Sequence, residues 1–287
     1  MTFSPTDAAF EGFRLTRREP QMIVSLGLLY FVFTALFLVA TYGPMREVMT
    51  MVTAMEGGAQ PDEAEMMAMM SAYGKIMGIT FVPNLIVGSI MQAAILRAYF
   101  RPEDKLYGYI RLGKDEARLT IVNLLITLIV AAVSMVGFGV VGVLFGFGMN
   151  GFPIVAVIGA LLVFPLVAAL IWLAVKLSLS VPISFTEGKI GIADSFCVTK
   201  GRFWPLLGMM ILTGVLVIVV SILLSIITTP LTLLTGGGIA ALANDTNLSG
   251  MLMTALFVWA VTSAVAYAVQ SLLLYTPVAA AWKAFRG

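Results

Sequence analysis

The sequence has no histidine, a single cysteine and little charge: 11% of its 287 residues are charged, whereas 60% are hydrophobic. Without histidine, acid–base catalysis and metal ligation lose the side chain that most often performs them. Cys197 has no second cysteine with which to form an intramolecular disulfide. A soluble domain needs more charge than this to cover its surface, so the composition indicates a membrane protein.

Apolar runs that can cross a bilayer, which takes about 20 residues, recur along the whole chain. They cover residues 21–42, 76–99, 120–147, 154–181, 205–229 and 251–282. Because residues 1–20 are charged, we expect the first run to be retained as a span and not removed as part of a signal peptide. We predict an all-α, polytopic integral membrane protein with six transmembrane helices, forming a single domain over residues 1–287.

The longest predicted loop, residues 44–73, is expected to form two short helices separated by residues 56–61. Pro44 stands at its start and is expected to end the first span. Half of the 18 methionines fall within residues 45–77. Thioethers suit Cu(I), but methionine is also a pliable apolar filler, and no histidine or cysteine accompanies it here. We therefore predict no metal site and no cofactor.

The basic residues indicate the orientation. If the N-terminus is cytoplasmic, six spans place both termini, residues 97–119 and residues 176–204 on that side. These regions hold all of the 17 basic residues except Arg46 and Lys75. The positive-inside rule predicts a bacterial inner-membrane protein with cytoplasmic N- and C-termini and with residues 43–75 in the periplasm.

Three segments of the predicted cytoplasmic side resemble one another. Residues 12–20, 108–116 and 195–203 each combine a small residue, an aromatic ring and a basic cluster, and each precedes a helical hairpin. We predict three short amphipathic helices in the membrane interface, which suggests a pseudo-threefold repeat. The repeats would be residues 8–99, 100–185 and 186–287. The alternative is that cytoplasmic loops of membrane proteins are commonly basic and aromatic.

This basic and aromatic belt favours anionic lipid headgroups, although ordinary anchoring of the topology explains it as well. The candidate headgroup contacts are Arg14, Arg17, Arg18, Arg111, Lys114, Lys200, Arg202 and Trp204.

Polar side chains within the predicted spans are nearly all neutral. Lys176 is ionisable, but it lies near the inner end of its span, where it can snorkel. No carboxylate lies within a predicted span, so no pair is poised there for acid–base catalysis, and we predict that the protein is not an enzyme. Interhelical hydrogen bonds explain most neutral polar residues at depth, but such residues also line cavities. The candidates are Asn84, Gln92, Asn123 and Gln270.

Residues 177–208 follow a recognisable pattern: a proline in an apolar run, a Glu-Gly turn, a short helix with a serine and a threonine, a basic–glycine pair, and two aromatics opening the next span. The matching residues are Pro182, Glu187, Gly188, Ser195, Thr199, Lys200, Gly201, Arg202, Phe203 and Trp204. The stretch resembles a broad bacterial family, the membrane domain found beside some glycerophosphoryl diester phosphodiesterases and more often alone. Phe196 stands where that family commonly has a tryptophan. The remaining chain agrees with the family in topology alone. The family is named after a neighbouring enzyme domain that we do not expect in these residues, so the resemblance implies no activity.

Two function classes remain. The first is a non-enzymatic scaffold or accessory protein of the inner membrane, associated with lipids or with a membrane complex. The alternative is a carrier or channel for an apolar or lipid-like small molecule. The expected partners are membrane lipids and either another membrane protein or a second copy of the chain; a net charge of +2 gives no reason to expect nucleic acid. A deep cavity lined by the four polar candidates favours the carrier, and an exposed glycine face on the third span favours the accessory role.

Overall fold

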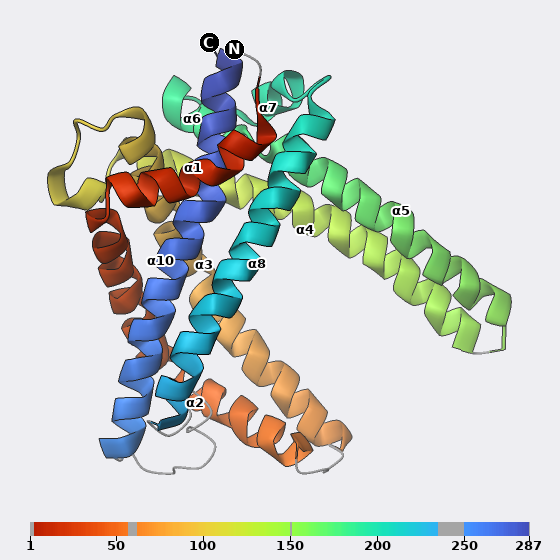
Figure 1. Ribbon diagram of the computed structural model, residues 1–287. Coiled ribbons are helices and arrows are strands. Elements are labelled where there is room, and N and C mark those ends of the chain that lie inside the picture. The colour runs from red at the N-terminus through yellow and green to blue at the C-terminus, as the bar shows by residue number, and fades with distance from the viewer. Residues whose placement is uncertain (1–2, 57–61, 150, 235–249, 287) are drawn as a thin grey trace.

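The computed structural model describes residues 3–56, 62–149, 151–234 and 250–286 (Figure 1), and all of the regular structure in these ranges is helical. Six segments are long and apolar enough to cross a membrane, which confirms the predicted all-α fold with six spans. They are formed by α2 (Gln21–Glu56), α3 (Glu63–Phe100), α4 (Lys114–Met149), α5 (Pro153–Leu177) together with α6 (Ser180–Glu187), α8 (Phe203–Leu234) and α10 (Gly250–Arg286). The shorter elements are α1 (Pro5–Arg18), η1 (Leu106–Tyr109) and α7 (Ile192–Val198).

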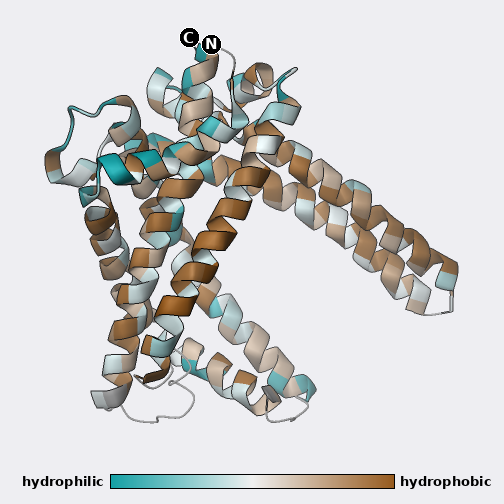
Figure 2. Ribbon diagram, in the orientation of Figure 1, coloured by the Kyte–Doolittle hydropathy of each residue, from teal (hydrophilic) through white to brown (hydrophobic). Residues whose placement is uncertain are grey.

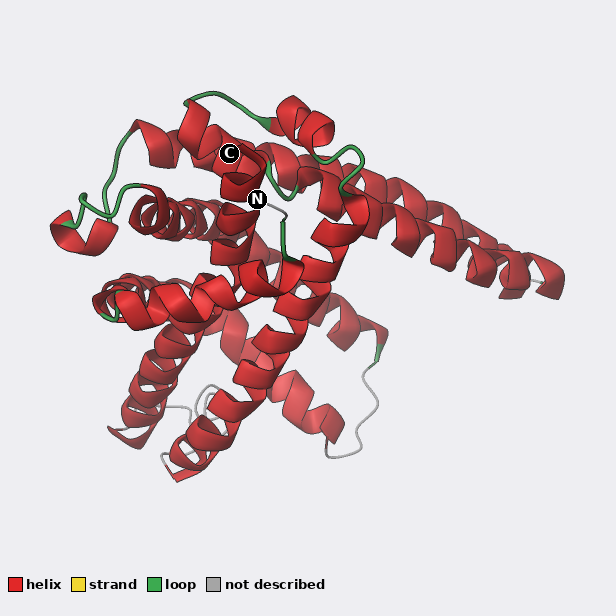
Figure 3. Cartoon of the chain, turned by 45° about the horizontal axis from the view of Figure 1, so that its top comes forward, coloured by secondary structure: helices red, strands yellow, loops and turns green. Residues whose placement is uncertain are grey.

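Helix α1 lies across the bundle near the end that holds both termini (Figures 1 and 3). The Ser4 side chain accepts a hydrogen bond from the Asp7 backbone N–H and so caps the helix start. The apolar face, which includes Ala8, Ala9 and Leu15, is buried, and α1 packs mainly against α10 and α8. The rest of the helix surface is largely hydrophilic (Figure 2) and also carries the exposed rings of Phe10 and Phe13. This confirms that the first segment forms an amphipathic helix; its place in the membrane interface stays a prediction. We call this end of the bundle, with α1, η1, α7 and the two termini, the terminal end.

The second predicted amphipathic helix needs correction. Between α3 and α4 the chain forms only the four-residue 3-10 helix η1, in which Tyr107 and Gly108 have φ values of 52° and 65°. A side chain at position 108 would also collide with Ser25, because an added Cβ would lie 2.5 Å from the Ser25 Oγ. The acidic residues Asp115 and Glu116 fall in the first turn of α4, where they complement the helix dipole. The basic segment is therefore divided between a tight turn and the start of a span.

The outer segment also differs from the prediction. Residues 44–56 and 63–75 do not form separate short helices but continue α2 and α3. Pro44 lies inside α2, which changes direction along its length (Figure 1), as a proline kink does. A capping box between Asp62 and Glu65 begins α3. Helix α8 likewise continues through Pro230, beyond the predicted end of its span at residue 229.

Helices α4 and α5 pack along each other and project from the rest of the bundle as a hairpin (Figure 1). Glycines allow the two helices to approach closely: a Cβ added at Gly148 would lie 2.3 Å from the Ala156 Cβ, and one at Gly137 would meet Leu166. Most of the hairpin is hydrophobic (Figure 2), and many of its large apolar side chains are exposed. The main core lies elsewhere, among α1, α2, α3 and α10, and its buried members include Leu15, Leu26, Met91, Ile95 and Leu272.

Candidate intramembrane binding site

A cluster of neutral polar side chains joins α3 to α4. The Asn123 Nδ2 donates hydrogen bonds to the Ser89 Oγ at 2.9 Å and to the Gln92 Oε1 at 2.8 Å. Ser89 and Gln92 lie nearly one turn apart on α3, so both reach the same residue of α4. Interhelical bonds of this kind hold membrane helices together.

The hydrogen-bond directions in this cluster are fixed. The Ser89 Oγ donates its proton to the Leu85 carbonyl at 2.7 Å, so it can only accept from Asn123. This sets the orientation of the Asn123 amide, whose NH2 group then requires the Gln92 oxygen as its second acceptor. The Gln92 Nε2 and the Asn123 Oδ1 are left without a hydrogen-bond partner among the residues that the structure describes.

Both amides line two cavities. The first has a volume of about 370 Å³ and lies between α3, α4, α5, α6, α8 and α10, at the root of the α4–α5 hairpin. Its wall is mostly apolar, with Leu96, Ile126 and Met210 among its members. The second cavity, of about 320 Å³, shares Gln92, Asn123, Ile126 and Tyr275 with the first. All described residues that line either cavity are uncharged.

The structure separates the four predicted cavity residues into two groups. Gln92 and Asn123 form the amide pair described above. Asn84 lines the second cavity and, with Gln270, a third cavity of about 340 Å³ between α2, α3 and α10. The Gln270 Nε2 donates to the Ser221 Oγ of α8 at 3.0 Å. Each of the four lies at a cavity wall, and within the described part of the chain only Gln92 and Asn123 are hydrogen-bonded to each other.

The residues predicted to contact lipid headgroups differ in whether they already bind other groups of the protein. Arg14 pairs with Glu11 at 3.2 Å and Asp7 at 3.3 Å, and these hydrogen bonds raise the pKa of its guanidinium. Arg18 donates to the Ala98 carbonyl, Arg111 pairs with Asp104, and the Arg202 guanidinium lies 4.4 Å from the Phe285 ring centroid. The remaining basic candidates are exposed and form no ion pair within the described ranges, and Trp204 is 77% exposed. They are Arg17, Lys114 and Lys200.

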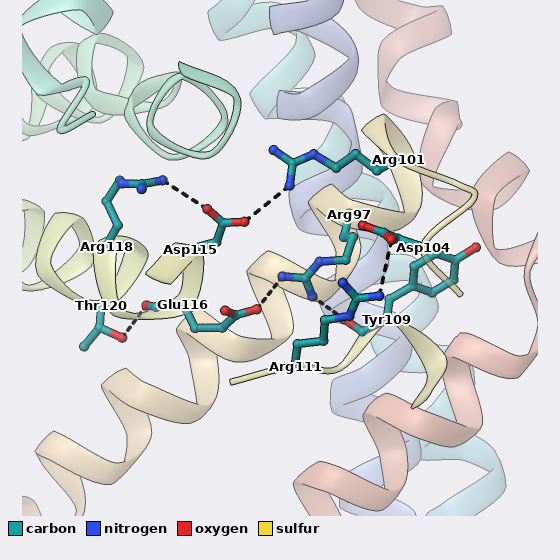
Figure 4. A network of polar contacts seen from close by, with 9 residues as sticks. All are labelled: Arg97, Arg101, Asp104, Tyr109, Arg111, Asp115, Glu116, Arg118 and Thr120. Carbon is teal, nitrogen blue, oxygen red and sulfur yellow. Dashed lines mark hydrogen bonds and ion pairs between the residues drawn. The ribbon is translucent and has the colours of Figure 1, made fainter. Parts of the chain in front are cut away.

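A buried ion pair was missed from the sequence. The Arg97 guanidinium of α3 binds the Glu116 carboxylate of α4, and it also donates to the Tyr109 carbonyl of η1 (Figure 4). The side chains of Arg97 and Glu116 are only 3% and 5% exposed. The available signal was positional: opposite charges flank a short connection between two antiparallel spans, where they meet across the hairpin.

A second, more exposed network surrounds this pair. Asp115 accepts from Arg118 at 3.1 Å and from Arg101 at 3.4 Å (Figure 4). The Arg118 guanidinium also donates to the Ser184 carbonyl of α6. These contacts tie the start of α4 to the end of α3 and to α6.

The family-like segment is held by local bonds. The Ser195 Oγ donates to the Lys176 carbonyl at 2.6 Å, and the Thr199 Oγ1 donates to the Ser195 carbonyl at 2.7 Å. Gly188 and Gly201 have φ values of 72° and 78°, which end α6 and the turn after α7. The Ser195 bond therefore joins α7 to the end of α5, whereas the Thr199 bond closes the end of α7 itself.

The fold and the cavities define a class: a helical, polytopic membrane protein with uncharged polar groups at intramembrane cavities. Comparison of the chain with protein-family models, curated proteins and solved structures finds no match.

Proposed function

We propose that the protein is a non-enzymatic membrane protein that binds an apolar or lipid-like molecule in the first cavity, as a carrier for that molecule does. The observation that carries the proposal is the amide pair of Gln92 and Asn123 at the wall of a mostly apolar cavity of about 370 Å³. Ligand sites are typically concave, mostly apolar and furnished with a few polar groups, with volumes of roughly 300–1,000 Å³.

The position of the cavity supports a ligand that arrives from the bilayer. Its wall combines the root of the α4–α5 hairpin with α8, and the hairpin projects away from α8 (Figure 1). The uncharged wall favours a hydrocarbon chain, because apolar contact requires no compensating charge.

Filling the cavity is expected to displace the ligand. Gly214 of α8 lines the first cavity, and a Cβ added there meets nothing within 4 Å, so Gly214→Phe fills the space without a backbone clash. In nanodiscs of native lipids, native mass spectrometry should find a stoichiometric lipid-like adduct on the unmodified protein. The adduct should be about tenfold less abundant on the variant, which is equivalent to a loss of 1.4 kcal/mol of binding free energy.

Gly208→Phe is the matched control. Gly208 lies on the same helix and is also open to an added Cβ, but it lines none of the described cavities. This variant should keep the adduct. An adduct equally abundant on Gly214→Phe, or none on the unmodified protein, would contradict the proposed function.

The outer face of α4 supports a second role, that of scaffold or accessory protein. An apolar groove of about 570 Å³ follows this face past Gly139, and neither Gly139 nor Gly142 has an atom within 4 Å of an added Cβ. Small residues let another membrane helix approach closely, from a partner protein or from a second copy.

Anionic headgroups would complement the exposed Arg17, Lys114 and Lys200 at the terminal end. The family resemblance of residues 177–208 stays a prediction.

We propose that the terminal end faces the cytoplasm of a bacterial inner membrane and that residues 43–75 face the periplasm. Both termini lie at one end, where the Phe3 and Phe285 rings are 4.8 Å apart. The exposed Cys197 of α7 provides the test. A membrane-impermeant maleimide should label it in inside-out vesicles and leave intact spheroplasts unlabelled.

The control for this labelling is Lys75→Cys in a Cys197→Ser background. Position 75 is exposed in the outer half of α3, so its labelling should show the opposite sidedness. Labelling of Cys197 in intact spheroplasts would reverse the proposed orientation.

A further inference from the structure

We infer that the ligand of the first cavity is an uncharged amphiphile with a hydroxyl headgroup, bound between the Gln92 Nε2 and the Asn123 Oδ1. The inference rests on the proposed function, because it names the class of molecule that the cavity would take. It depends on the hydrogen-bond directions within the amide cluster and on the charge of the surrounding side chains.

The amide pair offers a ligand one N–H donor group and one carbonyl acceptor. Asn123 makes both of its side-chain hydrogen bonds through Nδ2, and Gln92 is bound through Oε1. Among the described residues, the Asn123 Oδ1 is therefore an unused acceptor and the Gln92 Nε2 an unused donor. Gln92 is 8% exposed, and both residues line the cavity. An amide group in a membrane interior costs several kcal/mol when it has no partner, so the ligand should supply both partners.

A hydroxyl group satisfies both sites at once. Its oxygen accepts from the Gln92 Nε2, and its proton is donated to the Asn123 Oδ1. A ketone, quinone or ester carbonyl satisfies only Gln92, since it has no proton to donate. The two amides are already joined at 2.8 Å, so a small headgroup lying against the pair can reach both.

The electrostatics disfavour an ionised headgroup at this position. None of the described residues that line the first cavity is charged. Arg97, five residues after Gln92 on α3, is already neutralised by Glu116. The Lys176 Nζ lies over the Trp172 ring, 5.9 Å from its centroid. A phosphate or ammonium group placed against the amides would lose its hydration without gaining a counter-ion.

The test compares three photoactivatable lipids with the same diazirine-labelled acyl chains: a diacylglycerol, its 3-O-methyl ether and the matching phosphatidylglycerol. Each is incorporated into nanodiscs with the full-length protein, and the crosslinked peptides are mapped. The diacylglycerol should label peptides of α3, α4 and α8 that line the cavity. The ether lacks the donated proton and should label them about tenfold less, a difference equivalent to about 1.4 kcal/mol. The phospholipid should also label them about tenfold less, because its phosphate would be buried without a counter-ion.

Gln92→Leu should reduce labelling by the diacylglycerol to the level of the ether. The matched control is Gln270→Leu, which also removes an intramembrane amide but lies at the third cavity and should keep the preference. If Gln92→Leu does not fold, the comparison between the diacylglycerol and its ether on the unmodified protein still decides the question.

The outcomes separate the two proposals. Equal labelling of the cavity by all three lipids would overturn the hydroxyl assignment and leave the proposed lipid binding intact. A preference for the diacylglycerol that survives Gln92→Leu would overturn the role of the amide pair. Absence of cavity labelling by every lipid would contradict both the inference and the proposed function.

Discussion

Glu116→Ala is expected to destabilise the protein by about 3–5 kcal/mol, because it leaves the Arg97 guanidinium buried without a counter-ion. Arg97 is 3% exposed and has no other carboxylate partner among the described residues. Without the Glu116 carboxylate, the hydrogen bond from Arg97 to the Tyr109 carbonyl is also weakened, so η1 is held less firmly against α3. Thermal unfolding in detergent should show a large fall in Tm, and limited proteolysis should show faster cleavage between α3 and α4.

Two further variants separate burial of the charge from loss of the pair. Arg97→Met combined with Glu116→Leu removes both charges and should recover most of the stability, since apolar replacement of a buried pair is often neutral or stabilising. Asp115→Ala removes a carboxylate that is 25% exposed and pairs with Arg118 and Arg101, and it should cost about 1 kcal/mol or less. If Glu116→Ala also costs less than about 1 kcal/mol, water must reach the pair and the burial argument is wrong.

Composition and apolar run length were sufficient to predict the class and the number of spans, because a bilayer imposes a minimum length on any helix that crosses it. The helix ends were harder to predict. Pro44 was read as a terminator, but membrane helices tolerate proline when neighbouring groups satisfy the freed carbonyl. The stretch around Gly108 was read as a helix because its composition is amphipathic. Its backbone instead follows the tight approach to Ser25, a tertiary contact that no local pattern reveals.

The candidate site was predicted residue by residue but not as an arrangement. Gln92 and Asn123 stood out because amides are uncommon in apolar spans, yet nothing in the sequence sets the register between α3 and α4. The ion pair between Arg97 and Glu116 was missed for the same reason: each charge was read as part of a cytoplasmic loop. When α3 and α4 pack against each other, the Arg97–Glu116 ion pair at the terminal end and the Gln92–Asn123 amide pair deeper in the span belong to the same α3–α4 interface.

Gly12→Ala is expected to destabilise the docked position of α1 by about 1–3 kcal/mol, the usual range for overpacking. An added Cβ would lie 2.9 Å from the Leu273 Cα and 3.2 Å from the Leu272 carbonyl oxygen of α10. Since the neighbour is backbone, it cannot rotate away, and α1 must shift. The arginines near the end of α1 provide the measurement, because trypsin should cleave there faster in the variant.

Gly27→Ala is the matched control for this effect. Gly27 is also a glycine inside a helix, but its added Cβ would meet only the Ala264 carbonyl oxygen at 4.0 Å. Alanine favours a helix over glycine by up to about 1 kcal/mol, so this variant should be unchanged or more stable. The two substitutions make the same chemical change and should act with opposite sign. If both raise the stability equally, α1 is not held against α10, and the close approach at Leu273 does not fix the interfacial helix in place.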